Sequence, residues 1–200
     1  MRTQVFKVNP SNPEKDKIQR IAKIIKAGGV VGIPTETVFG LCCDASNKEA
    51  IDKLYRIKKR PEQKPFTIQI ESLDRLLDYV DEISPGKKSV LGKFWPGPLT
   101  VILNTKNGKT GFRIPDNKCA LSIIKEVGSS LAVTSANMSG EKAVSSAEDL
   151  LNIFDGLIEA VVDDGTKACG IESSVVDFTL SPPKILRFGA NADKLRNLLI

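Results

Sequence analysis

The pattern of apolar and polar positions divides the chain into short apolar runs and longer segments in which apolar residues return every three or four positions. The short runs are typical of buried strands, and the periodic segments are typical of helices with one buried face. We expect strands at 4–8, 30–33, 66–70, 99–103, 111–114, 131–134, 161–163, 174–178 and 184–187. We expect helices at 13–27, 47–60, 72–80, 84–93, 117–127, 146–154 and 191–199.

Local signals mark the ends of several of these elements. Asn12 and Pro13 have the chemistry of a helix cap and first helical position, and Asn47 can cap the next helix. Pro61 cannot continue that helix and should end it. Residues 34–37 follow a short buried strand, and we expect them to form a turn that exposes two hydroxyls and a carboxylate.

The predicted strands and helices follow one another along all 200 residues without an internal repeat or a linker of biased composition. Many short strands separated by helices of uneven spacing are typical of α/β proteins. We therefore predict a single α/β domain over residues 1–200, with a twisted mixed β-sheet flanked by helices.

Composition limits the chemistry that this domain can perform. The chain has no histidine, so a Ser-His-Asp triad, a Cys-His pair and a histidine-ligated zinc are excluded. The four cysteines lack the paired spacing of a zinc site and should be reduced, partly buried thiols. Neither of the common glycine-rich nucleotide motifs, GxGxxG and GxxxxGK[S/T], occurs. The formal net charge of +5 suits a nucleotide or RNA partner, but ordinary soluble proteins have similar charges.

No apolar stretch approaches the roughly 18 residues that would span a bilayer, and the first residues do not resemble a signal peptide. We therefore expect a cytoplasmic protein.

One basic run, KKRPEQKP at 58–65, places four cations at the end of a predicted helix and in the turn after it. Arginine offers phosphate a rigid fork of donors and lysine a mobile point charge, so the run could hold a polyanion such as a triphosphate. The alternative is a solvated helix end, because the helix dipole also favours cations there.

Two clusters of small polar residues, 133–140 and 170–174, lie at the ends of predicted strands, and Arg113 and Arg187 lie in or beside strands. Each cluster alone is explained by turn capping. Hydroxyls, an amide and glycines can also donate hydrogen bonds to an anion without adding charge. Together with the basic run, the clusters favour an anion-binding site. We assign the stretch WPGP at 95–98 to architecture, as a rigid turn.

These segments together resemble the YrdC-like family of threonylcarbamoyl-adenylate synthases. The resemblance covers nearly the whole chain, in family order, through GGVVGIPTETVFGL at 28–41, KKRPEQKP at 58–65, WPGPLT at 95–100, RIP at 113–115, SANMSG at 135–140, ESSVVD at 172–177 and LRFG at 186–189. It implies the open, twisted α/β fold of the YrdC and RibB proteins. Because the chain ends at Ile200, we interpret it as a short, single-domain member.

The resemblance also implies an activity. Family members are nucleotidyltransferases that join L-threonine, bicarbonate and ATP into threonylcarbamoyl-AMP and release pyrophosphate. A downstream transferase complex uses this product to install N6-threonylcarbamoyladenosine in tRNA. The resemblance implies Mg²⁺ carried by ATP, no tightly bound cofactor and no dedicated protein metal site.

Site residues are carried over from the family motifs onto matching positions of this chain. The residues implied for threonine are Thr37, Gln69, Arg113, Val133 and Ser173. Those implied for ATP are Lys58, Arg60, Lys64, Lys109, Ser135, Asn137 and Arg187. Within that second set, the residues implied for catalysis are Lys58, Arg60, Ser135 and Asn137.

The chain departs from the family pattern at five positions. Gln69 stands where many members have a histidine, and Phe39 replaces a tyrosine. Cys42 replaces a small residue, and Ala143 and Lys109 stand where relatives often have hydroxyls near ATP. Because glutamine cannot transfer a proton near neutral pH, we predict that histidine-based proton transfer is not essential here.

An interpretation of a different class remains open. Some relatives of this fold were first described as binding double-stranded RNA. A basic face could make the protein a non-catalytic module that binds double-stranded RNA, tRNA or the ribosome. The neutral donors Ser135 and Asn137 favour the enzyme, because a module that only binds RNA needs positive charge but not this donor set.

Overall fold

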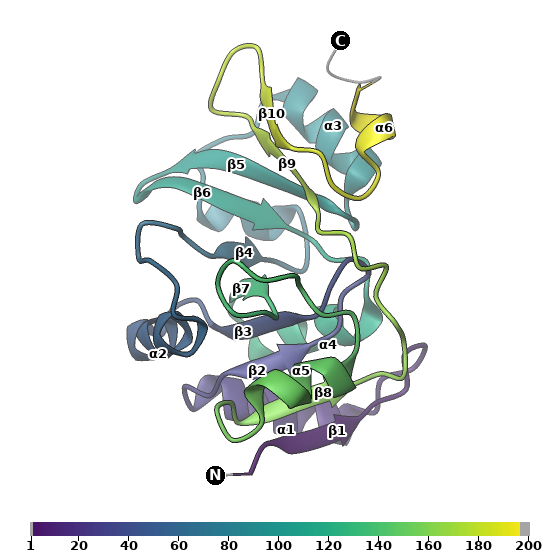
Figure 1. The fold of residues 1–200 in the computed structure, drawn as a ribbon. Helices are drawn as coiled ribbons and strands as arrows, with labels where there is room; N and C mark the ends of the chain where they lie inside the picture. The colour runs from purple at the N-terminus through teal and green to yellow at the C-terminus, as the bar shows by residue number, and fades with distance from the viewer. Residues whose placement is uncertain (1, 197–200) are drawn as a thin grey trace.

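The computed structural model describes residues 2–196, and within them all ten strands join one sheet (Figure 1). The strands are β1 (Gln4–Lys7), β2 (Val31–Ile33), β3 (Gly40–Asp44), β4 (Thr67–Gln69), β5 (Leu99–Thr105), β6 (Gly108–Arg113), β7 (Leu131–Ser135), β8 (Ala160–Asp163), β9 (Ser174–Asp177) and β10 (Lys184–Arg187). The helices are α1 (Lys15–Lys26), α2 (Lys48–Lys58), α3 (Pro85–Phe94), α4 (Lys118–Val127), α5 (Ala147–Phe154) and α6 (Ala192–Arg196), with the 3₁₀ helix η1 (Asp74–Asp78) before α3.

The strands lie in the order β1-β8-β2-β3-β7-β4-β6-β5-β9-β10. The pairs β1–β8, β8–β2, β4–β6 and β5–β9 are parallel, and the other neighbours are antiparallel. The sheet is therefore mixed, and helices cover it, as predicted for an α/β fold.

Alternate residues of the central strands face opposite sides of the sheet, as the period of two requires. Val31 and Val133 belong to a core that includes the inner faces of α1 and α4. Leu41 and Ala132 belong to a second core, with α2 and α5. A third core packs η1 and α3 against β5, β6 and β9. The two ends of the sheet thus have separate cores, and Ile68 of the strand β4 packs against cores of both ends (Figure 1).

Side-chain caps explain where several helices begin. Asn47 accepts a hydrogen bond from the backbone of Ala50 and starts α2, as predicted. Ser84, Asn117 and Ser146 cap α3, α4 and α5 in the same way. The last helical residue of α2 is Lys58, because Lys59 adopts a left-handed conformation, with φ 49°.

The prediction that Asn12 caps the first helix is wrong. The helix α1 begins at Lys15, after Glu14, and the side chain of Asn9 accepts the backbone N–H groups of Ser11 and Asn12. This turn occupies the segment that would otherwise have been the first helical turn.

Two other predicted regions need correction. The strand β3 was not expected, because Gly40, two cysteines and Asp44 have little strand propensity and no polar alternation marks a strand buried on both faces. The expected helix at 72–80 is the shorter 3₁₀ helix η1. The last predicted helix is present as α6, and positions 197–199 lie outside the described residues.

Cys42, Cys43 and Cys119 are buried and Cys169 is exposed, and all four are free thiols. Burial raises the pKa of Cys43 to about 12, so this thiol is not reactive near neutral pH. Over residues 2–196, no helix combines the length and apolar character needed to cross a membrane.

Candidate functional site

A cavity of about 70 Å³ opens near the middle of the sheet, and it is lined by residues that belong to or adjoin β2, β3, β7, β4 and β6. A buried water needs roughly 10–15 Å³, so this cavity has room for a small molecule but not for a whole nucleotide. Its lining includes every residue predicted to bind threonine and two of those predicted to bind ATP, which together are Thr37, Gln69, Arg113, Val133, Ser173, Ser135 and Arg187.

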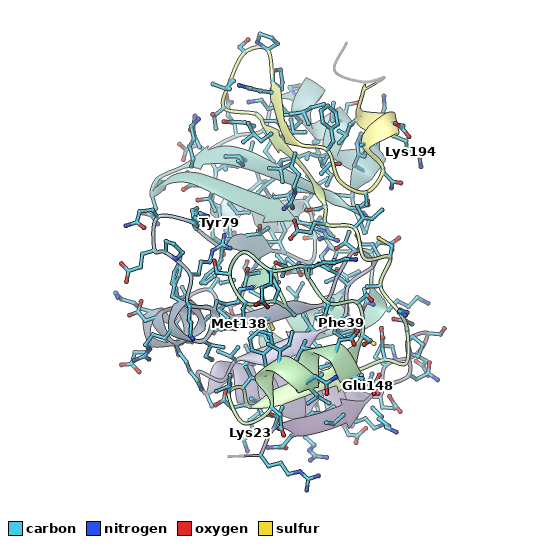
Figure 2. The ribbon with its side chains drawn as sticks, in the orientation of Figure 1. Lys23, Phe39, Tyr79, Met138, Glu148 and Lys194 are labelled. Atoms are coloured by element: carbon cyan, nitrogen blue, oxygen red, sulfur yellow. The ribbon has the colours of Figure 1, made fainter. Side chains whose placement is uncertain are left out.

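Backbone hydrogen bonds connect segments that are far apart in sequence around this cavity. The backbone of Cys169 donates to the carbonyl of Glu36, and that of Gly170 donates to the carbonyl of Thr37 at 2.8 Å. These bonds join the turn after β2 to the segment before β9, which runs along one side of the molecule (Figure 1). Phe39 lies near the middle of the molecule in Figure 2, and its side chain is fully buried.

The donor and the acceptor of the hydrogen bond between the Thr35 and Thr37 hydroxyls can be assigned. Thr35 Oγ1 donates its one proton to the carbonyl of Val38 at 2.6 Å, so the 2.9 Å bond between the two hydroxyls must be donated by Thr37. Thr37 therefore offers only lone pairs to the cavity. Gln69 is 3% exposed, and its Oε1 has no hydrogen-bond partner among residues 2–196. Both side chains suit a ligand that donates hydrogen bonds, such as an amine.

Arg113 is held in place from two sides. Its Nη2 lies 2.7 Å from Glu36 Oε1, and its Nε donates to the carbonyl of Gly97 at 3.2 Å. The remaining N–H groups of the guanidinium are left for a ligand, and a carboxylate matches their geometry. The turn at 95–98, which we had assigned to architecture, thus also orients a residue of the site.

Arg187 also lines the cavity. It donates to the carbonyl of Ser173 at 2.9 Å and to its Oγ at 3.3 Å, and it pairs with Glu172 at 2.5 Å. The Ser173 hydroxyl is also 2.8 Å from Thr100 Oγ1. Ser173, assigned to the threonine set, is therefore in contact with Arg187, assigned to the ATP set.

Lys58 forms the centre of a buried network beside the cavity. Its Nζ donates to the carbonyl of Ser135 at 2.5 Å, to Asn137 Oδ1 at 2.9 Å and to the carbonyl of Asn137. The Ser135 hydroxyl donates to the same Oδ1 at 2.6 Å. Burial, followed by the charge of Arg60, lowers the pKa of Lys58 to about 8. Three of the four residues predicted for catalysis are thus in direct contact.

Arg60 and Lys64 lie on the loop that follows α2. Arg60 donates to the carbonyls of Lys64 and Pro65, at 2.8 and 3.1 Å, and its guanidinium carbon lies 5.5 Å from the centre of the Phe66 ring. Burial lowers the pKa of Arg60. The Lys64 side chain is exposed. The loop therefore holds Arg60 in a curled conformation and leaves Lys64 facing solvent.

Lys109 is not brought together with the other predicted ligands. It lies four residues before Arg113 on β6, about 13 Å along the strand, and pairs with Asp177 at 3.1 Å. Its assignment to ATP stays a prediction without geometric support from this structure.

Glu36 and Glu172 are the acidic residues of the site that the sequence analysis did not assign to it. The turn at 34–37 was expected to expose two hydroxyls and a carboxylate, but Thr35 and Thr37 are buried and the oxygens of Glu36 are buried beside Arg113. Glu172 lines the cavity. The available signal was their position inside the motifs at 28–41 and 172–177, because each glutamate lies one residue from a predicted threonine ligand.

The described residues contain no group of three or more cysteine, aspartate or glutamate side chains placed to hold a metal ion. The two carboxylates nearest the cavity are already paired with arginines. This donor set does not form a protein cage for Mg²⁺, which prefers several free oxygen ligands.

Comparison with known proteins places the chain in a family. The family model Sua5/YciO/YrdC, described as "Telomere recombination", matches residues 23–189. The threonylcarbamoyl-AMP synthase of Bacillus subtilis (strain 168) is 34% identical over 184 residues, covering 86% of this chain and 53% of that protein. The enzyme of the same name from Pyrococcus abyssi is 34% identical over 186 residues, covering 88% of this chain and 55% of that protein. The chain thus spans about half the length of these curated relatives.

Solved structures agree with this result. The crystal structure of P. abyssi Sua5 complexed with L-threonine superposes with a TM-score of 0.93 and 32% identity, covering 98% of this chain and 61% of that one. Escherichia coli YciO, at 24% identity and a TM-score of 0.86, supports the fold; the match covers 94% of this chain and 96% of that one. From its sequence, its fold and these matches, the chain belongs to the Sua5/YciO/YrdC family.

Proposed function

We propose that this protein is a threonylcarbamoyl-AMP synthase that uses L-threonine, bicarbonate and ATP and releases pyrophosphate. The observation that carries the proposal is one cavity in which a buried arginine and two hydrogen-bond acceptors lie together, next to a network of cations and neutral donors. The names of the similar proteins, and the L-threonine in the Sua5 complex, support the same substrate.

The amino acid would bind in the cavity through both of its polar ends. The N–H groups of Arg113 that face away from Glu36 and Gly97 would bind its carboxylate. Thr37 Oγ1 and Gln69 Oε1 would accept hydrogen bonds from its amine. This arrangement holds the amine at a defined place, where its lone pair can attack carbon dioxide and lose a proton, or attack bicarbonate with loss of water, so that an N-carboxylate forms in either case.

The resulting N-carboxylate would then attack the α-phosphorus of ATP. A bond forms between a carboxylate oxygen and phosphorus, the bond to the bridging oxygen of the α- and β-phosphates breaks, and pyrophosphate leaves. Lys58, Arg60 and Arg187 would offset the charge that develops on the leaving group. Because the carboxylate itself is the nucleophile, the chain needs no histidine and forms no covalent intermediate.

Magnesium enters this proposal only as a companion of ATP. The carboxylates near the cavity are engaged by Arg113 and Arg187, so we assign the ion to the phosphates and not to a protein site. The product is a mixed anhydride, a class of compound that water hydrolyses. We therefore also propose a cytoplasmic partner that transfers the threonylcarbamoyl group to tRNA, in line with the names of the similar proteins.

The central experiment is to incubate the protein with ATP, bicarbonate and labelled threonine. We expect labelled threonylcarbamoyl-AMP and one pyrophosphate per product, formed only when threonine is present. Substitution Arg60→Ala should lower turnover about 100-fold without unfolding the protein. The exposed Arg56, on the helix that precedes the loop of Arg60, gives the matched control Arg56→Ala, which should keep normal turnover. A protein without threonine-dependent pyrophosphate release would contradict the proposal.

The RNA-binding alternative makes a different prediction. Binding driven by phosphate contacts weakens steeply as salt rises, and it would appear without threonine or ATP. Measuring RNA affinity between 50 and 200 mM salt, on the order of the range where such contacts are lost, together with the synthase assay separates the two functions.

A further inference from the structure

Glu172 is a carboxylate within a group of cations that the proposed function assigns to phosphate. Its side chain lines the cavity together with Arg187, and the two are 2.5 Å apart. Ser135, whose carbonyl binds the ammonium of Lys58, lines the same cavity. An acidic side chain at this position is unexpected. It takes up space that a triphosphate would need, and it pairs with a cation that the triphosphate would bind.

The charge of Glu172 also reaches the two cations at the end of α2. It favours the charged forms of Lys58 and Arg60 and so opposes the lowering of each pKa by burial. One carboxylate therefore interacts with three positive groups from two distant parts of the chain. A triphosphate in the same place would interact with the same three groups.

The Glu172 side chain can move away from Arg187 without breaking the other hydrogen bonds of Arg187 or of the Glu172 backbone. The ion pair is half exposed on both sides, with 42% of the Arg187 side chain and 40% of the Glu172 side chain accessible, and such pairs are weak. Arg187 keeps two other bonds, both to Ser173. The backbone of Glu172 is anchored separately, because its carbonyl accepts the N–H of Ala190 at 2.9 Å. Only a side-chain rotation is needed to free the guanidinium.

We propose that the Glu172 carboxylate acts as a stand-in for phosphate in the free protein, that the polyphosphate of the nucleotide displaces it, and that it returns to Arg187 as pyrophosphate leaves. This inference rests on the proposed function for the identity of the substrate. It adds that Glu172 offsets part of the positive charge of the site in the absence of nucleotide, and that the protein itself competes with its leaving group. Competition of this kind weakens polyphosphate binding and favours product release.

The test is direct binding of inorganic tripolyphosphate, measured by calorimetry without threonine. We expect Glu172→Gln to bind about fivefold more tightly than the unmodified protein, because the competing ion pair is lost while the shape of the side chain is kept. Glu82, an exposed residue of the loop before α3, gives the matched control Glu82→Gln, which removes the same charge elsewhere. The control should bind like the unmodified protein, and the melting temperatures of all three should be compared.

The outcomes separate this inference from the proposed function. Equal or weaker binding by Glu172→Gln, or equal tightening by both variants, would overturn the stand-in role even if the synthase assay succeeds. Failure of both the unmodified protein and Glu172→Gln to bind tripolyphosphate would overturn the stand-in role, whereas the proposed function is decided by the synthase assay. Tight binding by Glu172→Gln in a protein that makes no threonylcarbamoyl-AMP would support the stand-in role and contradict the proposed reaction.

Discussion

Two glutamate–arginine pairs place their arginines at the same cavity, and they differ chiefly in exposure. Glu36 and Arg113 are 2.7 Å apart, with 22% and 7% of their side chains accessible. Glu172 and Arg187 are 2.5 Å apart, with 40% and 42% accessible. A buried pair cannot separate without leaving a charge in a medium that solvates it poorly, whereas water readily replaces either partner of an exposed pair. The same two residue types thus form a rigid support in one place and an exchangeable contact in the other.

This difference matches the two ligands that we propose. The amino acid is small and must present its amine at one place, which suits a guanidinium held on two sides by Glu36 and Gly97. The triphosphate must enter and its pyrophosphate must leave in every catalytic cycle. This suits the exposed pair of Glu172 and Arg187, because Arg187 can bind either the carboxylate or a phosphate.

The largest expected effect comes from breaking the buried pair. Substitution Arg113→Met should lower the free energy of unfolding by about 3–5 kcal/mol, because Glu36 would remain buried without its counter-charge. It should also abolish threonine binding. Urea unfolding monitored by circular dichroism measures the first effect. The double variant Glu36→Leu with Arg113→Met should recover most of the stability but none of the activity. If the single variant were as stable as the unmodified protein, the pair would not be a rigid support.

A smaller effect concerns how the free energy of unfolding depends on pH through the buried Lys58. The pKa of Lys58 is about 8 in the folded protein and near 10.5 in the unfolded chain. Between these values the unfolded chain binds more protons, so the contribution of Lys58 to the free energy of unfolding should rise as pH increases from about 8 to 10.5. We expect a difference on the order of 1 kcal/mol between unmodified protein and Lys58→Met across this window. Parallel pH profiles for the two proteins would contradict the lowered pKa.

The smallest effect on stability should come from the exposed pair. Substitution Arg187→Met should change the free energy of unfolding by less than about 1 kcal/mol, because Glu172 remains in contact with water. The affinity for tripolyphosphate should nevertheless fall, because Arg187 is one of the cations proposed to bind phosphate. Chemical denaturation and calorimetry on the same variant measure both quantities. A loss of stability as large as that of Arg113→Met would remove the distinction between the two pairs.

The elements that the sequence predicted well are those with a clear local signal. The helix after Asn47 has a capping residue and a regular apolar face, and both signals can be read from one short stretch of sequence. The strand β3 was missed because it is buried on both faces and begins with a glycine, so neither alternation nor composition marks it. The first helix was placed too early because Asn9, and not Asn12, organises the turn before it.

The α/β class and the chemical groups of the site could be predicted from the amino-acid sequence, since apolar periodicity and the motifs at 28–41, 58–65 and 135–140 are local properties of the chain. Which charged side chains pair with one another depends on the packed fold. Glu36 pairs with Arg113 across 77 positions, which is 113 minus 36, while Lys109 on the same strand lies apart from the cavity. The physical reason is that partners so distant in sequence are set by strand order and register, to which the whole packed sheet contributes.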